Sequence, residues 1–221
     1  MYQYILFDLD GTLTDPKIGI TTCVQYALHK MGIEEPDLDR LKLFIGPPLT
    51  DSFREFYGMN EEEAVQAVEY YRERFSTVGL FENEVYPGIP DLLADLKQKG
   101  RKLAIASSKP TVYVKRILEH FSICEYFDVI VGSELDGTRC RKEEVVEEAL
   151  RQLVPDDVAE KNVVMIGDRR FDIEGAKAYR VPSIGVDYGY AAEGELIEAG
   201  ADRVVETVQE LAELLLKDDR R

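Results

Sequence analysis

The sequence predicts an α/β fold, in which a Rossmann-like core of parallel strands is flanked by helices and carries an inserted all-helical domain. From about residue 89 onward, short apolar segments alternate with segments of helical periodicity, which is typical of a parallel sheet covered on both faces. Another apolar segment lies near the N-terminus, and nothing between the two regions alternates like a strand. The predicted core therefore comprises residues 1–15 and 84–221, and the insertion comprises residues 16–83.

The first predicted strand is the apolar run Tyr4-Ile5-Leu6-Phe7, which leads directly into Asp8 and Asp10. Successive residues of an extended chain point to opposite faces, so both carboxylates are expected to project from one side, where the strand gives way to Gly11. Two carboxylates this close repel each other and perturb each other's pKa. A cation or a shared proton would relieve the repulsion, and the pair favours a metal site with one carboxylate free to attack.

The inserted segment is predicted to be helical throughout. Apolar residues recur at helical spacing in residues 24–31 and again in residues 64–75. Shorter helical pieces at 38–43 and 49–57 flank Gly46-Pro47-Pro48, a stiff turn that cannot lie inside a helix. Its rigidity makes Gly46 a candidate for contact with a substrate, and the alternative is a plain turn between two packed helices.

Helices and strands alternate after a polar segment that ends in Pro87-Gly88. Helices are predicted over residues 89–99, 110–121, 142–153, 171–179, 195–199 and 207–217. Strands are predicted over residues 102–106, 128–131, 162–166, 181–186 and 203–205. Ligands of open parallel sheets bind outside the carboxyl ends of the strands, so the residues at those ends are the candidate site.

Polar and charged residues follow these strands closely. Carboxylates suit a hard divalent cation, while hydroxyl groups, backbone donors and an ammonium group suit phosphate oxygens. In chain order, the candidates are Asp8, Asp10, Ser107, Ser108, Lys109, Lys142, Asp168 and Asp172.

Several of these residues also have a plain structural interpretation. Ser107 and Ser108 could cap the helix predicted over residues 110–121. Asp168 and Asp172 could likewise cap the helix predicted over residues 171–179. Because Asp168 follows an apolar strand and a glycine, the metal role is favoured for it.

Lys142 opens a predicted helix, where the helix dipole disfavours a positive charge. A lysine at this position is therefore expected to have a role other than stabilising the helix. Lys109 is the competing cation, and the residues by themselves leave the choice between the two open.

The four groups of residues resemble the motifs of the haloacid dehalogenase superfamily of phosphatases, and within it the phosphoglycolate phosphatase-like group. The resemblance covers the whole chain, and it implies that the insertion is a helical cap. Its motifs are Phe7-Asp8-Leu9-Asp10-Gly11-Thr12-Leu13, Ala106-Ser107-Ser108-Lys109-Pro110, Lys142, and Ile166-Gly167-Asp168-Arg169-Arg170-Phe171-Asp172.

The resemblance implies a magnesium-dependent phosphomonoesterase that hydrolyses a small phosphorylated metabolite, such as phosphoglycolate or a nucleoside monophosphate, through an aspartyl phosphate. Asp8 would attack phosphorus, and Asp10 would act first as general acid and then as general base. The implied magnesium ligands are Asp8, the backbone carbonyl of Asp10, Asp168 and, in the outer shell, Asp172. The implied contacts to the substrate are Gly11, Ser107, Ser108 and Lys142, with Gly46 as the candidate from the cap.

Two other functions remain open. A phosphosugar mutase similar to β-phosphoglucomutase would return the phosphoryl group to a sugar hydroxyl, and the four motifs do not separate it from a phosphatase. A receiver-like signalling domain also combines carboxylates, a hydroxyl residue and a lysine on a parallel sheet, but it would not need a large helical insertion. Turnover of a phosphate ester would discriminate between an enzyme and such a domain.

Composition narrows the class of partner. The formal net charge of −16, without a basic tract, argues against nucleic acid and anionic membrane surfaces as partners. The three cysteines show no CxxC spacing, and no leader or bilayer-spanning run is recognised, so a cytoplasmic protein is expected. It would act on a small phosphate ester as a monomer or homodimer.

Overall fold

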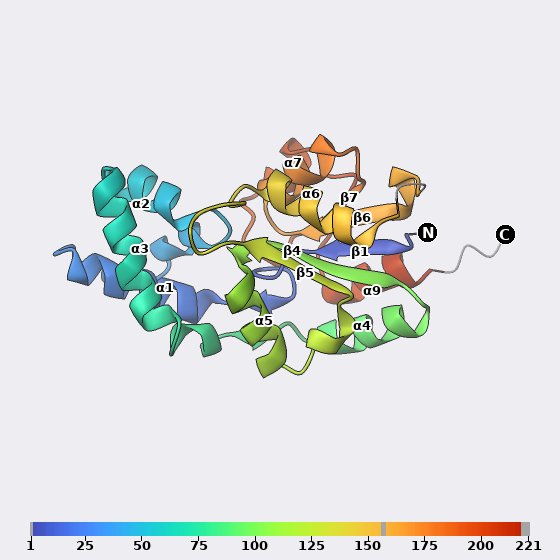
Figure 1. The fold of residues 1–221 in the computed structure, drawn as a ribbon, viewed down its shortest axis with the longest axis horizontal. Coiled ribbons are helices and arrows are strands. Elements are labelled where there is room, and N and C mark those ends of the chain that lie inside the picture. Colours follow the sequence, from blue (N-terminus) through green and yellow to red (C-terminus); the bar gives the residue numbers. More distant parts are fainter. Residues whose placement is uncertain (1, 156–157, 218–221) are drawn as a thin grey trace. The chain divides into compact units, whose positions relative to one another are not determined.

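The computed structural model describes residues 2–155 and 158–217, which form two compact units (Figure 1). The larger unit contains the described residues up to Thr14 and from Val85 onward, and the smaller unit runs from Asp15 to Glu84. None of the described helices is long and apolar enough to cross a membrane.

A six-stranded parallel sheet forms the centre of the larger unit, as the sequence predicts. Strand β1 lies between β4 and β6, and the strand order is β5-β4-β1-β6-β7-β8. Later strands thus extend away from β1 in both directions, so its carboxyl end lies at the point where ligands bind in such sheets. The bounds are Tyr4–Phe7 for β1, Lys102–Pro110 for β4, Val129–Ser133 for β5, Val163–Gly167 for β6, Ser183–Val186 for β7 and Arg203–Val205 for β8.

Helices cover both faces of this sheet (Figure 1), which confirms the predicted α/β class. One face carries α6 (Lys142–Leu153) and α7 (Arg170–Ala178). The other carries α4 (Ile89–Gln98), α5 (Thr111–His120) and α9 (Val208–Leu216), and a short helix, α8 (Glu195–Glu198), follows β7.

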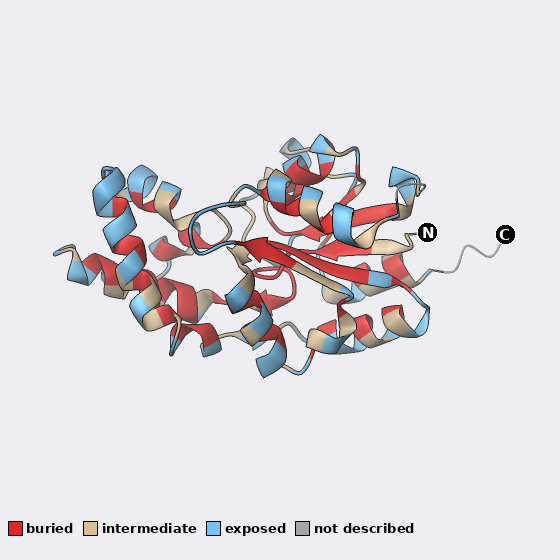
Figure 2. Cartoon of the chain, viewed as in Figure 1, coloured by how far each residue is buried: buried red, intermediate tan, exposed pale blue. Residues whose placement is uncertain are grey.

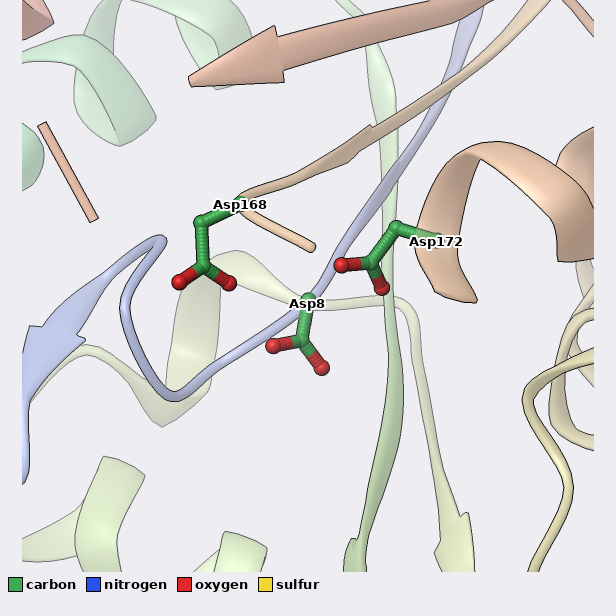
Figure 3. Close-up of side chains that lie close together, drawn as sticks. All are labelled: Asp8, Asp168 and Asp172. Carbon is green, nitrogen blue, oxygen red and sulfur yellow. The ribbon is translucent and has the colours of Figure 1, made fainter. Parts of the chain in front are cut away.

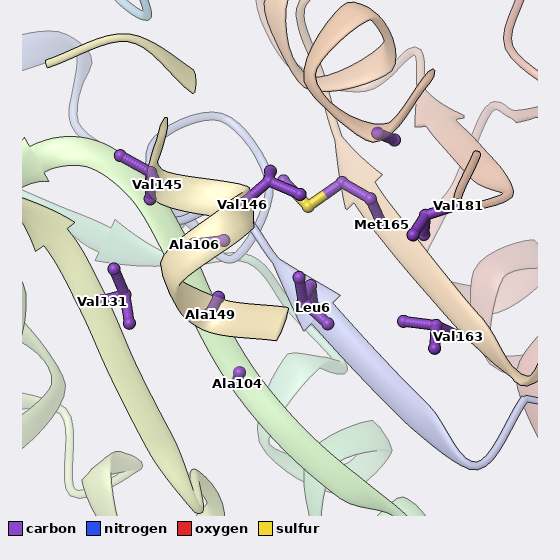
Figure 4. Close-up of a cluster of buried hydrophobic side chains, with 11 residues drawn as sticks. Leu6, Ala104, Ala106, Val131, Val145, Val146, Ala149, Val163, Met165 and Val181 are labelled. Atoms are coloured by element: carbon purple, nitrogen blue, oxygen red, sulfur yellow. The ribbon is translucent and has the colours of Figure 1, made fainter. Parts of the chain in front are cut away.

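Strands β1, β6 and β7 are buried along most of their length (Figure 2), because each face of the sheet packs against helices. On the α6 and α7 side, Leu6 of β1 and Met165 of β6 pack with Val146 of α6 in one hydrophobic cluster (Figure 4). Full burial of a side chain such as Leu6 contributes about 1.5–3 kcal/mol. Since side chains alternate along a strand, Asp8 follows Leu6 on the face that α6 and α7 cover.

The smaller unit is built from α1 (Lys17–Lys30), α2 (Leu49–Tyr57) and α3 (Glu61–Phe75), with 3₁₀ turns at Arg40–Phe44 and Gly79–Phe81. Helix α3 begins with a capping box, in which Asn60 and Glu63 each accept a hydrogen bond from the other's backbone N–H. Gly46 has a φ of 108°, a conformation that few other residues adopt. Short strands β2 (Thr14–Asp15) and β3 (Glu84–Val85) pair in a sheet of their own.

Strand β4 continues four residues beyond the predicted end at Ala106. Its register with β5 shifts between Ala106 and Pro110, and the Ser133 hydroxyl donates to the Ser108 carbonyl over 2.7 Å. These bonds from β5 hold an irregular strand end that contains no apolar run. The hydrophobic pattern therefore marked only the buried part of the strand.

Asp128, which precedes β5, offers a test of stability in this unit. Its carboxylate accepts hydrogen bonds from Lys97 Nζ at 2.8 Å, Lys102 Nζ at 2.9 Å and the backbone N–H of Leu103 at 3.0 Å. Partial burial raises the pKa of Asp128, but these three donors outweigh it and lower the pKa from 3.8 to about 2. The bonds therefore stabilise the fold fully above pH 3.8, and this contribution is lost as the pH falls through 2.

We expect Asp128→Asn to lower the free energy of unfolding by about 1 kcal/mol at neutral pH, after allowance for solvent screening. Urea unfolding at neutral pH and near pH 2 measures the effect, and the difference from the wild type should shrink at the lower pH. Asp95→Asn, an exposed change on α4, is the matched control. A loss that is equal at both pH values would contradict the role given to the charge.

Candidate active site

Residues predicted from four separate segments converge at the carboxyl end of β1. Asp8 follows β1, Asp168 follows β6, Asp172 lies in the first turn of α7 and Lys142 is the first residue of α6. All four are nearly inaccessible, with between 0 and 6% of their surface exposed. Charged groups this deeply buried require partners, so their contacts define what the site can do.

Three carboxylates form an acidic cluster, which consists of Asp8, Asp168 and Asp172 (Figure 3). Each offers one oxygen, and these oxygens all lie within 4.8 Å of one another. Burial, followed by the charges of Asp172 and Asp8, raises the pKa of Asp168 well above its ordinary value. Burial likewise raises the pKa of Asp172 to about 6, against the opposing effect of Lys142. The cluster is therefore short of positive charge.

Lys142 supplies an ammonium group that contacts two members of this cluster. Its Nζ lies 2.7 Å from Asp8 Oδ1, 2.7 Å from Asp172 Oδ1 and 3.0 Å from the carbonyl oxygen of Ala106. Burial alone would lower the pKa of Lys142, but the carboxylates of Asp172 and Asp8 outweigh it and raise the pKa. These contacts account for a lysine at the start of α6, where the helix dipole disfavours it.

The residues fit a hard divalent cation. All three side chains offer carboxylate oxygens, and Asp168 Oδ1 is buried without a hydrogen-bond partner in the described part of the chain. With three carboxylates and one ammonium group, the cluster keeps two formal negative charges. One divalent cation would balance them.

Asp10 lies apart from the acidic cluster and has its own cation. Asp10 Oδ2 is 2.8 Å from Lys109 Nζ, and the two side chains are 10% and 6% exposed. Burial raises the pKa of Asp10, and the ammonium group of Lys109 opposes the rise. The strand ends at Phe7, and the carbonyl of Leu9 then accepts turn hydrogen bonds, so the alternation of faces does not carry both carboxylates to the same partners.

Glycines let the backbone approach these carboxylates closely. Gly11 has a φ of +83°, and a Cβ there would lie 2.0 Å from Asp168 Oδ2. A Cβ at Gly167 would lie 2.1 Å from Cγ of Asp172. The backbone N–H of Tyr190 donates to Asp168 Oδ2 over 2.8 Å, and this bond fixes one oxygen of that carboxylate. Gly11 thus shapes the site through its backbone, whatever contact it makes with a substrate.

The serines of the second motif do not cap helix α5, which has no side-chain cap. Ser107 is 2% exposed and its hydroxyl accepts a weak hydrogen bond of 3.4 Å from the backbone N–H of Lys109. Ser108 is half-buried and is anchored through its carbonyl to β5. Asp172, in contrast, does accept from the backbone N–H of Arg169 at 3.1 Å, so it contributes to the start of α7 as well as to the cluster.

Two contacts of the site were not predicted from the sequence. From the sequence, Lys109 and Lys142 are alternatives for a single cation of the site. In the structure both lysines contact it: Lys142 pairs with Asp8, and Lys109 pairs with Asp10. The Tyr190 amide donor left no signal of its own, because any residue other than proline carries that group. Gly46 lies in the smaller unit, and its contact with a substrate stays a prediction.

Comparison with known proteins places this geometry in a family. The sequence pattern of the haloacid dehalogenase-like hydrolases matches residues 5–186. A 5'-nucleotidase of Pseudomonas aeruginosa is 51% identical over 88% of this chain and 87% of its own length. The tyrosine-protein kinase PtkA of Mycobacterium tuberculosis is 39% identical over 96% of this chain and 72% of its own length. The crystal structure of a predicted phosphatase from Clostridium acetobutylicum, 49% identical, superposes with a TM-score of 0.93 over 98% of this chain and 99% of that one.

Proposed function

The chain belongs to the haloacid dehalogenase-like hydrolase family and is a phosphoric monoester hydrolase, and we propose that it uses magnesium to hydrolyse a small phosphorylated metabolite. The family is the one that the four motifs predict. The observation that carries the proposal is the buried cluster of Asp8, Asp168 and Asp172, which together with Lys142 keeps two formal negative charges that a divalent cation would balance.

In this proposal, Asp8, the backbone carbonyl of Asp10 and Asp168 would hold the magnesium ion, with Asp172 in its outer shell. Oxygen donors suit this hard cation. When bound, magnesium would draw negative charge from the phosphoryl oxygens and from the three carboxylates.

The protein's own groups supply the remaining chemistry. A carboxylate oxygen of Asp8 forms a bond to phosphorus while the bond to the leaving oxygen breaks and Asp10 donates its proton to that oxygen. Asp10 then takes a proton from water, whose oxygen displaces Asp8 from phosphorus and releases inorganic phosphate. Lys142 remains beside Asp8 and offsets charge on the nucleophile and the phosphoryl group.

A nucleoside monophosphate and phosphoglycolate are the proposed substrates. The relative named 5'-nucleotidase supports the first, and the resemblance to phosphoglycolate phosphatases supports the second. No feature of the site favours a mutase or a receiver-like domain over hydrolysis. We propose further that the helical segment of residues 16–83 is a cap that selects the substrate, with Gly46 near the bound ester, and that the protein is cytoplasmic, in keeping with its three free cysteines.

A screen for phosphate release tests this function. Purified protein is assayed in the presence of magnesium with phosphoglycolate, nucleoside monophosphates, sugar phosphates and pyrophosphate. The Asp8→Asn variant is the negative control. Repeated turnover of at least one monoester, dependent on Asp8, is the expected result. If phosphate moves instead from ATP to a tyrosine peptide and no ester is hydrolysed, the proposal is wrong and the activity named for PtkA becomes the better one.

Asp168→Asn tests the metal site separately from turnover. The amide oxygen of asparagine can still accept from the Tyr190 N–H, so the fold should persist, but the charge that attracts the cation is lost. Magnesium at 100 times its dissociation constant stabilises a folded protein by about 2.7 kcal/mol. We expect magnesium to raise the melting temperature of the wild type and of Asp95→Asn. If magnesium raised the melting temperature of Asp168→Asn by the same amount, Asp168 would not be a ligand of the metal.

A further inference from the structure

Lys109 has no assigned role in the proposed chemistry, although its buried side chain pairs with that of the general acid, Asp10. Their charged atoms are 2.8 Å apart, and little of either side chain is exposed. A buried pair of this kind is weak evidence for stability, because removing two charges from water offsets most of their attraction. The pair therefore needs another explanation, and its position beside the nucleophile offers one.

The two carboxylate oxygens of Asp10 have different surroundings. Lys109 contacts Oδ2, while Oδ1 is buried and has no hydrogen-bond partner among the described residues. Lys142 is engaged elsewhere, because its Nζ donates to Asp8 Oδ1 and to the Ala106 carbonyl and forms an ion pair with Asp172 Oδ1 at 2.7 Å. One oxygen of Asp10 is thus held and the other is left for a reacting group.

The position of Lys109 is itself fixed by the sheet. It lies on the irregular end of β4, where the Ser133 hydroxyl bonds the neighbouring Ser108 carbonyl at 2.7 Å. The backbone of β5 also passes close beneath it, since a Cβ at Gly132 would lie 2.3 Å from the Lys109 carbonyl oxygen. A lysine that starts from such a constrained backbone can hold a carboxylate in one orientation.

We infer that Lys109 is a positioning residue for the general acid: it binds Oδ2 of Asp10 and presents Oδ1 to the leaving oxygen and, later, to the attacking water. This inference rests on the proposed function. The proton moves between Asp10 Oδ1 and the leaving oxygen as the ester bond to phosphorus breaks, and Lys109 keeps all its protons throughout. Lys142 therefore offsets charge at the nucleophile Asp8, and Lys109 orients the general acid Asp10.

A series of leaving groups tests this role, because a poor leaving group needs the acid and an activated one does not. For Lys109→Met, kcat for the alkyl phosphate that the wild type hydrolyses fastest should fall by about 10²-fold. For p-nitrophenyl phosphate, kcat should fall by less than about threefold, since that leaving oxygen departs without a proton. Lys109→Arg should recover most of the alkyl activity, and Lys115→Met, an exposed change on α5, should alter neither.

A double-mutant cycle shows whether Lys109 acts through Asp10. Once Asp10→Asn has removed the acid, adding Lys109→Met should change kcat by less than about twofold. If the two losses multiply, or if Lys109→Met slows both esters equally or raises KM alone, the inference is overturned. Should Lys109→Met fail to fold by circular dichroism, Lys109→Gln replaces it with the same two expectations. A wild type that releases no phosphate from any ester contradicts the proposed function instead.

Discussion

Replacing Asp8 with asparagine is expected to lower kcat for every phosphate ester by at least about 10⁴-fold, because the amide has nearly the same shape but cannot attack phosphorus. The structure gives Asp8 two roles at once, as a member of the acidic cluster and as a partner of Lys142 at 2.7 Å. Phosphate release under saturating substrate and magnesium measures the loss, with Asp95→Asn as the control.

The stability of this variant distinguishes the nucleophile from a structural residue. Asp8→Asn removes repulsion from Asp168 and Asp172, but it also removes attraction to Lys142, so the two effects oppose each other. The melting temperature of the metal-free variant should therefore stay close to that of the wild type. Retention of more than a small fraction of activity would show that Asp8 is not the nucleophile, and a large fall in melting temperature would show that the loss comes from misfolding.

Removing Lys142 is expected to damage both stability and catalysis. Lys142→Met leaves Asp8 and Asp172 buried beside Asp168 without their ammonium partner. Breaking a buried ion pair from one side costs about 3–5 kcal/mol, and loss of a group that stabilises developing charge lowers kcat by about 10²–10³-fold. Urea unfolding and phosphate release measure the two effects, and the exposed change Lys161→Met is the control.

Two further measurements separate the causes of these losses. Magnesium should restore part of the stability of Lys142→Met, because the ion supplies positive charge to the same carboxylates. The double variant Lys142→Met/Asp172→Asn should also recover stability, since one buried charge is gone, but it should not recover kcat. A loss of stability below about 1 kcal/mol in Lys142→Met would show that the cluster does not depend on this lysine for charge balance.

The α/β class and the identity of the candidate residues followed from local pattern. Apolar strands buried on both faces cannot alternate with polar residues, so the run Tyr4–Phe7 and its later counterparts were recognisable, and the carboxylates that end them stood out. The end of β4 was missed because its last four residues are held by bonds from β5 rather than by burial of apolar side chains.

Only the tertiary structure determined which lysine pairs with which aspartate. The sequence set Asp8 beside Asp10 and offered Lys109 and Lys142 as competing cations, whereas the fold directs Lys142 to Asp8 and Lys109 to Asp10. It also brings Asp168 and Asp172 to Asp8 and excludes the side chain of Asp10 from that cluster. The reason is physical: pairing depends on distances of a few ångströms between segments more than 90 residues apart, and these are set by strand order and helix packing. The residue types determine which functional groups are available for catalysis. The packing of the sheet and its helices determines which of these groups lie in contact.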